Sequence, residues 1–264
     1  METIVSRTLS VHNEHEVLLK LEAAGLTDDL AQRVIGSKGN DLAMKVVRFI
    51  SRGGFEATTS QKRAREIMGR NMFGVEEVIQ HFGVNPSRQQ TAGLSEIPFS
   101  EATLEQYKET HVLVAIFPLS ILDIRGKAAE GQRLFYDQGW YNKQSFAKER
   151  GEAGLPAGQA GWRLVCKTPV ANSTSKTWSE QQALLGKDEE TPATRVMVYT
   201  IIGHFLATGE RLFETGYVRC SDLDSHGNHV NVGLFGQNGL NIYNIWHTYR
   251  CDDLGLPSSL KFQD

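Results

Sequence analysis

The chain has 264 residues, of which 40% are hydrophobic and 22% charged, and its formal net charge is −3. This composition is typical of a globular protein that buries a core without disulfide bonds. No stretch approaches the ~18 uninterrupted apolar residues of a membrane-spanning helix, and the low net charge argues against a protein that coats nucleic acid.

The N-terminus lacks a basic segment followed by an apolar one, so the sequence predicts no secretory signal. The three cysteines, Cys166, Cys220 and Cys251, are far apart and form no C-x-x-C pair. A disulfide framework is therefore not expected, and a reducing compartment fits best. We expect a cytoplasmic location, with display at a cell surface by another route as the alternative.

The first hundred residues are predicted to form short helices. Thr27, Asn40, Ser60 and Ser100 are good N-cap residues, and a further helix is expected over residues 75–82. No heptad pattern persists, so a coiled coil is not expected. On this basis residues 1–105 are predicted to be a helical N-terminal region.

The pattern changes after residue 110. Residues 112–122 have the length and β-branched content of a buried strand, with Pro118 either ending it or marking a sheet edge. Residues 151–161 have the composition of a flexible loop or insertion. Residues 192–207 form the most apolar predicted helix, which should lie in the core. The predicted fold class of the chain is α+β.

Three short alternating segments follow Phe213 and are separated by turns at 225–228 and 236–239, which is the pattern of a β-meander. In the middle segment Val230 and Val232 point to one face of the sheet. His229 and Asn231 point to the other. The sequence therefore predicts one ordinary core face and one exposed face of mixed polar and aromatic side chains.

Residues 215–260 contain no Lys, Glu, Met or Ala, although these types are common upstream. Solvated faces favour Lys and Glu, whereas Tyr, Asn, His, Ile and Thr together are typical of an antibody-like contact surface. A plain solvated face with a C-terminal loop is the alternative interpretation. We expect a ligand-binding surface over residues 219–252, with Tyr243, Trp246 and Tyr249 as aromatic anchors. Its candidate residues are Cys220, His226, Asn228, His229, Asn231, Leu234, Gly236, Asn241, Tyr243, Asn244, Ile245, Trp246, His247, Thr248, Tyr249 and Cys251.

The stretch from RVMVYTIIGHF to GLPSSLKF resembles the C-terminal half of the variable proteins of diversity-generating retroelements. The matching features are GYVRCSD at the start of one strand, VNVG in the next, GLNIYNIW before the variable patch, and GLPSSLKF as a closing strand. Such elements rewrite adenines of a template repeat, so that asparagine codons become codons for many residue types. The sequence departs from its relatives at His247-Thr248-Tyr249, where they often carry acidic residues, and at GLP, which replaces the commoner GL-Ser.

The resemblance implies a C-type lectin fold, in its formylglycine-generating-enzyme-like version, for residues 106–264. It also implies non-covalent recognition of a macromolecular ligand, with protein as the expected class, and neither catalysis nor a cofactor. Nucleic acid and membranes are not expected partners, and the oligomeric state is left open. The alternative is a lectin-fold enzyme that uses cysteine redox chemistry or a metal site, related to the formylglycine-generating oxidases.

Several other residues have chemistry-bearing side chains for which we expect structural roles. His204 lies on the apolar helix and should be a buried, hydrogen-bonded core residue. The histidines of the C-terminal segment lack the spacing of metal ligands. Calcium ligation is the alternative role for four aspartates that are expected to bind turn and strand-end amides, namely Asp222, Asp224, Asp252 and Asp253. A solvated face, rather than a nucleic-acid contact, is expected for Lys62, Arg63, Arg65 and Arg70.

Overall fold

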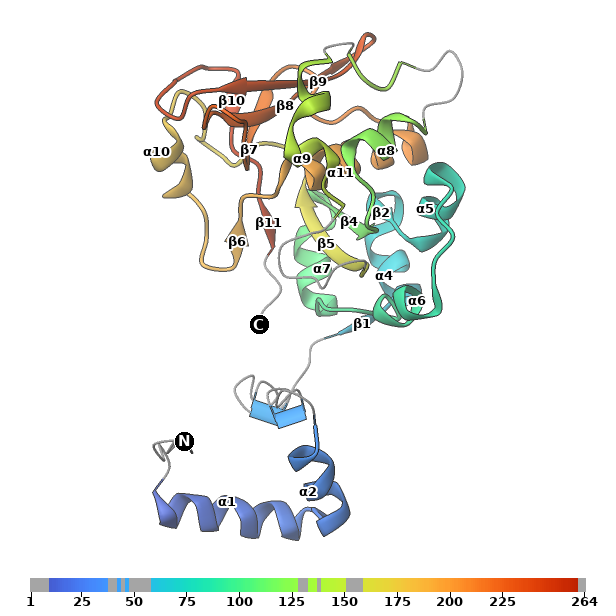
Figure 1. The fold of residues 1–264 in the computed structure, drawn as a ribbon, viewed down its shortest axis with the longest axis vertical. Coiled ribbons are helices and arrows are strands. Elements are labelled where there is room, and N and C mark those ends of the chain that lie inside the picture. The colour runs from blue at the N-terminus through green and yellow to red at the C-terminus, as the bar shows by residue number, and fades with distance from the viewer. Residues whose placement is uncertain are drawn as a thin grey trace. The chain divides into compact units, whose positions relative to one another are not determined.

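The computed structural model describes residues 10–37, 42–43, 46–47, 58–127, 133–136, 139–150 and 159–260. It divides the chain into two compact units, Met1–Glu56 with Asp264, and Ala57–Gln263 (Figure 1). The predicted N-cap at Asn40 and most of the predicted loop at 151–161 lie outside the described residues. Among the described residues, no helix is both long enough and apolar enough to cross a membrane.

The described part of the first unit contains helices α1 (Val11–Ala23) and α2 (Asp28–Ile35). Ser10 caps α1 by accepting a hydrogen bond from the amide of Asn13 at 3.2 Å. Thr27 caps α2 in the same way, as the sequence predicts. Each cap satisfies an amide at the helix N-terminus that has no partner within the helix.

The boundary between the two units lies near residue 56 and not at the predicted residue 105. Strand β2 (Met72–Phe73) pairs in parallel with β4 (His111–Ile116), which ties the two predicted regions into one sheet. The ring of Phe73 also packs edge-on against that of Tyr199, with centroids 6.2 Å apart. Helical periodicity identifies these helices but does not say what they pack against, so the sequence placed them in a separate region.

A five-stranded sheet with the order β2-β4-β5-β11-β6 lies at the centre of the second unit. Its other strands are β5 (Gly161–Cys166), β6 (Glu189–Glu190) and β11 (Ser259–Leu260). Strand β4 ends at Ile116, before Pro118, and the last two residues of the predicted strand, Ile121 and Leu122, begin helix α8 (Ile121–Arg125). All six residues of β4 are buried, as expected of a strand with both faces covered.

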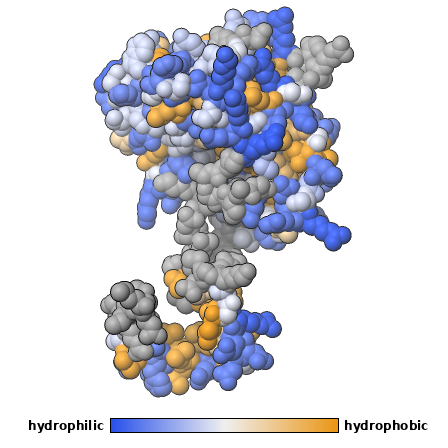
Figure 2. Space-filling model, viewed as in Figure 1, coloured by the Kyte–Doolittle hydropathy of each residue, from blue (hydrophilic) through white to orange (hydrophobic). Residues whose placement is uncertain are grey.

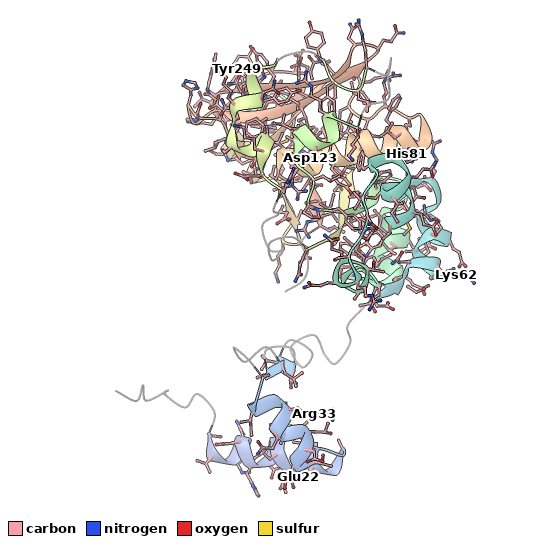
Figure 3. The ribbon with its side chains drawn as sticks, turned by 45° about the vertical axis from the view of Figure 1, so that its right-hand side comes forward. Glu22, Arg33, Lys62, His81, Asp123 and Tyr249 are labelled. Carbon is pink, nitrogen blue, oxygen red and sulfur yellow. The ribbon has the colours of Figure 1, made fainter. Side chains whose placement is uncertain are left out.

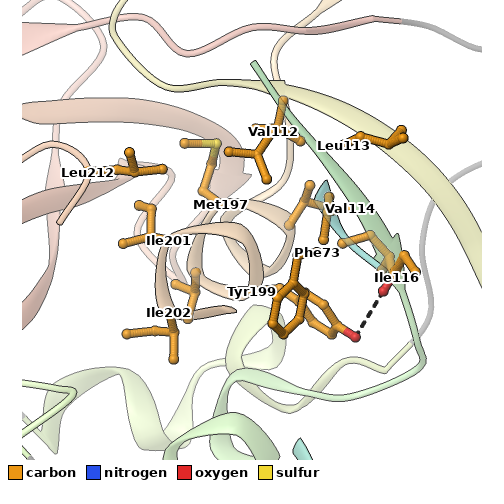
Figure 4. Close-up of a cluster of buried hydrophobic side chains, with 14 of the residues drawn as sticks. Phe73, Val112, Leu113, Val114, Ile116, Met197, Tyr199, Ile201, Ile202 and Leu212 are labelled. Atoms are coloured by element: carbon orange, nitrogen blue, oxygen red, sulfur yellow. Dashed lines mark hydrogen bonds between the residues drawn. The ribbon is translucent and has the colours of Figure 1, made fainter. Parts of the chain in front are cut away.

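Helix α11 (Thr194–Thr208) is the central core helix that the sequence predicts. Its residues from Thr194 to His204 are all buried. Figure 4 shows its side chains facing Val112 and Val114 of β4, while Leu113 points away from it. The hydroxyl of Tyr199 donates a hydrogen bond to the carbonyl of Ala115 at 3.0 Å, which satisfies this polar group inside the core.

The predicted β-meander is present as β7 (Tyr217–Leu223), β8 (His229–Gly236) and β9 (Gly239–Ile245). These strands pair antiparallel in sequence order, and β10 (Leu254–Gly255) adds to β7 in parallel. This four-stranded sheet lies at the top of Figure 1, with α11 beneath it. Asp222 of β7 accepts a hydrogen bond from the amide of Thr194 at 2.6 Å and so joins the sheet to the start of α11.

The remaining elements of the second unit are short, and they complete a mixed α+β fold of the predicted class. Helices that begin after Ser60 and Ser100 and a helix at Val75–Phe82 agree with the sequence. In chain order these elements are β1 (Thr59–Ser60), α4 (Gln61–Met68), η2 (Gly69–Asn71), α5 (Val75–Phe82), α6 (Arg88–Gly93), β3 (Glu96–Ile97), α7 (Glu101–Tyr107), η3 (Gly139–Lys143), α9 (Ser145–Lys148) and α10 (Trp178–Gln182).

Candidate functional site

The meander has one face in the core and one face turned away from it. Val230, Val232 and Ile242 belong to the core face and are buried. On the other face, pairing between the strands places Arg219, Asn231 and Tyr243 in one row across the sheet. Paired residues of neighbouring strands lie on the same face, so these three side chains belong to the face that the sequence predicts to be exposed.

The β8 part of this second face is covered, which contradicts the prediction that His229 and Asn231 are exposed. Both residues are buried. The ring of Trp178 from α10 stacks on that of His229, with centroids 3.9 Å apart, and burial is the main cause that lowers the pKa of His229. Alternation along a strand separates its two faces, but it does not show that a helix 50 residues upstream lies over one of them.

Cys220 is also buried and is not available to a ligand. Its thiol lies wholly inside the protein, where burial raises its pKa well above the ordinary value. A thiol nucleophile or redox cysteine requires an accessible thiolate, so this environment is typical of a structural cysteine. Cys251 is partly exposed and its pKa is raised by hydrogen bonding to Asp253.

Arg219 is completely buried beneath the segment that follows β9. Its guanidinium donates one hydrogen bond to Oε1 of Gln181 at 2.8 Å and another to the carbonyl of Tyr249 at 2.9 Å. Gln181 in turn donates to the carbonyls of Ser173 and Leu254, at 2.8 and 3.1 Å. Burial lowers the pKa of Arg219 to about 10, so the side chain keeps its charge at neutral pH.

Residues 246–253, which we call the display loop, join β9 to β10 and are held mainly through their backbone carbonyls. The amide of Trp178 donates to the carbonyl of His247 at 2.9 Å, and the amide of Ser175 donates to that of Cys251 at 2.7 Å. The amide of Tyr217 donates a third hydrogen bond, to the carbonyl of Asp253 at 2.7 Å. With the Arg219 contact, four carbonyls of the loop are fixed by residues outside it.

The side chains at the start of the display loop are directed to solvent. Trp246 is 55% exposed, and His247 and Thr248 are also exposed. Tyr249 is half-buried and packs edge-on against Trp246, with ring centroids 5.2 Å apart (Tyr249 is labelled in Figure 3). Tyr243 on β9 is 49% exposed. These are the predicted site residues that the structure brings together on an open surface.

The turn between β7 and β8 is built around the buried carboxylate of Asp224. It accepts hydrogen bonds from the amides of His226 and Asn228, at 2.8 and 2.9 Å, and from the side chains of Asn228 and Asn244. Burial alone would raise the pKa of Asp224, but these hydrogen bonds outweigh it and the pKa is lowered. Asn228 and Asn244 therefore hold the turn, and His226 is exposed beside them.

Four further predicted site residues lie half-buried around the β8–β9 hairpin, namely Leu234, Gly236, Asn241 and Ile245. The side-chain amide of Asn241 donates to the carbonyl of Leu234 at 3.2 Å. Leu234 itself has a positive φ of 44°, which is uncommon for a non-glycine residue. Asn241 and Leu234 thus contribute to the shape of the hairpin as well as to its surface.

Two tyrosines outside the predicted region 219–252 lie beside its exposed side chains. Tyr217 pairs with Gly233, which pairs with Asn241, so this row reaches across the sheet. The amide of Tyr136 donates to the carbonyl of Leu240 at 2.9 Å, which places this segment at the free edge of β9. Tyr136 is 40% exposed. Tyr217 belongs to the alternation of β7, but no pattern near Tyr136 indicates the pairing with β9.

The other candidates of the sequence have structural partners. His204 is buried and its Nε2 lies 3.0 Å from Oε2 of Glu210, while burial is the main cause that lowers its pKa. Asp222 and Asp224 accept amide hydrogen bonds, as expected. Ion pairs with carboxylates are formed by three of the four basic residues, namely Arg63, Arg65 and Arg70.

Among the described residues, one group has ligand atoms close enough to hold a metal ion, and it consists of Cys251, Asp252 and Asp253. Their ligand atoms lie within 4.8 Å of one another, and the two aspartates are exposed.

Comparisons with protein-family models, with curated proteins and with solved structures found no match to this chain.

Proposed function

We propose that the chain is the variable protein of a diversity-generating retroelement, with a C-type-lectin-like second unit that binds a macromolecular ligand without catalysis. The observation that carries this proposal is the way the display loop is held. Its carbonyls accept hydrogen bonds from Trp178, Ser175, Arg219 and Tyr217. Every one of these acceptors is a backbone atom, which is present whatever side chain the residue carries.

A loop held through its backbone keeps its shape while its side chains change. His247 and Thr248 are exposed, so replacing them removes little buried surface. Substitutions at such positions typically change stability by less than about 0.5 kcal/mol. This combination of a fixed backbone and exposed side chains is what a surface that differs between variants of one protein requires.

The exposed side chains suit the recognition of protein. Tyr243, Trp246 and Tyr249 supply large aromatic surfaces of low conformational entropy, which are frequent anchors of binding energy. His247 and Thr248 lie beside them and offer hydrogen bonds in several directions. Tyr136 and Tyr217 add aromatic surface from outside the variable segment, so part of the contact would stay constant between variants.

Sequencing of natural populations tests this proposal. Across codons 215–264, changes should concentrate at 226–252, at residues whose side chains are exposed, above all Tyr243, His247 and Thr248. A nearby imperfect repeat should differ from this stretch only at adenines. Val230, Val232 and Gly255 should be constant because they are buried. A population in which codons 215–264 are as constant as the rest of the gene would overturn the proposal.

Binding provides a second test that needs no natural variants. A display library that randomises Tyr243, His247, Thr248 and Tyr249 should give folded binders to unrelated protein targets. A matched library that randomises the buried residues His229 and Asn231 should give few folded members. Equal recovery of folded binders from both libraries would contradict the proposed division between fixed and free positions.

A further inference from the structure

Part of the exposed surface around the meander is formed by residues outside the segment 219–252. Tyr136 is 40% exposed at the free edge of β9, and Asp253 is exposed at the end of the display loop. Tyr217 is half-buried on β7, two residues before Arg219, so its side chain lies on the same face of the sheet as that of Arg219. The amide of Tyr217 donates a hydrogen bond to the carbonyl of Asp253 at 2.7 Å.

These side chains lie near one another and near Tyr243, which is 49% exposed on the same face. Burial is the main cause that raises the pKa of Tyr217. The remaining causes are electrostatic and come from three neighbours, namely Asp253, Tyr243 and Tyr136. Interactions of this kind weaken with distance, so the four groups share one part of the surface. We call Tyr136, Tyr217, Tyr243 and Asp253 the tyrosine patch.

The surface that contains the tyrosine patch has an excess of negative charge. Residues 217–253 contain four aspartates against two arginines and no lysine, which gives a net charge of −2. Asp252 and Asp253 are exposed, and neither forms an ion pair with another described residue. The exposed cation of the display loop, Arg250, is instead paired with Glu180 at 2.9 Å. Over the four-stranded sheet, at the top of the second unit, hydrophilic residues predominate (Figure 2).

This combination of side chains favours one chemical class of partner. The faces of aromatic rings attract ammonium and guanidinium groups, and a neighbouring carboxylate adds a charge of the opposite sign. An anionic partner, such as a nucleic acid, would be repelled by the aspartates. An apolar partner would remove them from water without an ion pair, which costs free energy.

We propose that the tyrosine patch binds an arginine or lysine side chain of a cationic segment on a protein partner, while the display loop contacts the surface around that side chain. This inference rests on the proposed function, because it assigns a partner class to the same surface. Tyr136, Tyr217 and Asp253 lie outside the segment 219–252. The preference for cationic partners is therefore shared by variants that differ within that segment.

The test is the binding of two labelled peptides to the full chain, measured by fluorescence anisotropy. One peptide carries arginines separated by glycine and serine, and in the other glutamate replaces each arginine. The wild-type chain should bind the arginine peptide and not the glutamate peptide, and added salt should weaken the binding. Tyr136→Ala and Asp253→Asn should each weaken the binding of the arginine peptide about 2–5-fold.

Matched variants separate recognition of the cation from a general loss of charge or of fold. Tyr136→Phe keeps the aromatic ring and should bind like the wild type. Glu76→Gln removes the same charge as Asp253→Asn, from an exposed position of α5, and should leave binding unchanged. Thermal unfolding of all four variants should match that of the wild type. Equal binding of the two peptides, or binding that Tyr136→Ala and Asp253→Asn leave unchanged, would overturn the inference.

A display library distinguishes failure of this inference from failure of the proposed function. Randomising His247, Thr248 and Tyr249 leaves the tyrosine patch intact. Folded binders should then be recovered more often against a basic target protein than against a charge-reversed copy of the same target. Equal recovery would overturn the cationic preference and leave the proposed function standing. Recovery of no binders to either target would contradict the proposed function, and the inference with it.

Discussion

Replacing Arg219 by Met tests whether the display loop is held through its backbone. Met keeps an apolar stem of similar length but cannot donate the hydrogen bonds to Gln181 and Tyr249, at 2.8 and 2.9 Å. Hydrogen bonds from charged donors contribute about 1.5–3 kcal/mol each. Met also avoids the cost of burying a charge whose Nε has no hydrogen-bond partner, which offsets part of the loss. We expect a net destabilisation of about 3 kcal/mol.

Urea denaturation followed by tryptophan fluorescence measures this loss, because Trp178 lies over the same face of the sheet. For a unit of this size, about 3 kcal/mol corresponds to a fall in melting temperature of roughly 6–12 °C. Arg219→Lys should lower the free energy of unfolding by about half as much, because Lys keeps the charge but reaches only one of the two acceptors. Thr248→Asn and Tyr243→Asn should change stability by less than about 0.5 kcal/mol.

The contrast between these variants decides the outcome. If Arg219→Met loses less than about 1 kcal/mol, the guanidinium does not hold the loop. If Thr248→Asn or Tyr243→Asn destabilises the chain as much as Arg219→Met, their side chains are part of the scaffold. Either result would refute the assignment of fixed backbone and free side chains.

Three further outcomes follow from the structure. Asp224 has a lowered pKa in the folded chain, so its carboxylate stabilises the fold above about pH 4 and this contribution is lost as the pH falls through the folded pKa. Asp224→Asn should therefore be less stable at pH 7 and lack that part of the acid-induced loss in a urea series. Gly203→Ala places a Cβ 2.7 Å from the ring of Phe73 and should cost about 1–3 kcal/mol in the same assay. An alkylating reagent followed by mass spectrometry should label Cys251 in the native chain and leave Cys220 unmodified until urea is added, and rapid labelling of native Cys220 would favour the enzyme alternative.

Patterns within a single element were predicted well from the sequence. Period-two alternation and the two turns gave the three strands of the meander, and apolar content gave α11 as the central helix. Thr27, Ser60 and Ser100 were recognised as N-caps because a side-chain oxygen three residues before a helical amide is a local feature. Such features depend on neighbours in the chain, which the sequence contains directly.

Features that depend on distant contacts were not predicted. The pairing of β2 with β4 moves the unit boundary to residue 56, and nothing near Met72 indicates that pairing. Two other features also depend on contacts between distant residues: Trp178 covers His229, and Tyr136 lies beside β9. In each case the sequence identifies the element and its faces, whereas the partner that buries a face comes from elsewhere in the chain.

The burial of His229 and Asn231 on β8 sharpens the proposed function, because it orders the positions by how freely their side chains can change. The side chains of His247 and Thr248 are exposed and the backbone of their loop is held from outside, so they should accept almost any residue type. Positions 241 and 245 on β9 are half-buried, and Asn241 also bonds to Leu234, so changes there should cost more. His229 and Asn231 are covered and should accept few. Tolerance to substitution should therefore be highest in the display loop, lower at β9 on the sheet edge and lowest at β8. Natural variation that follows this order would distinguish a displayed surface from a uniformly solvated one, in which all exposed positions vary alike.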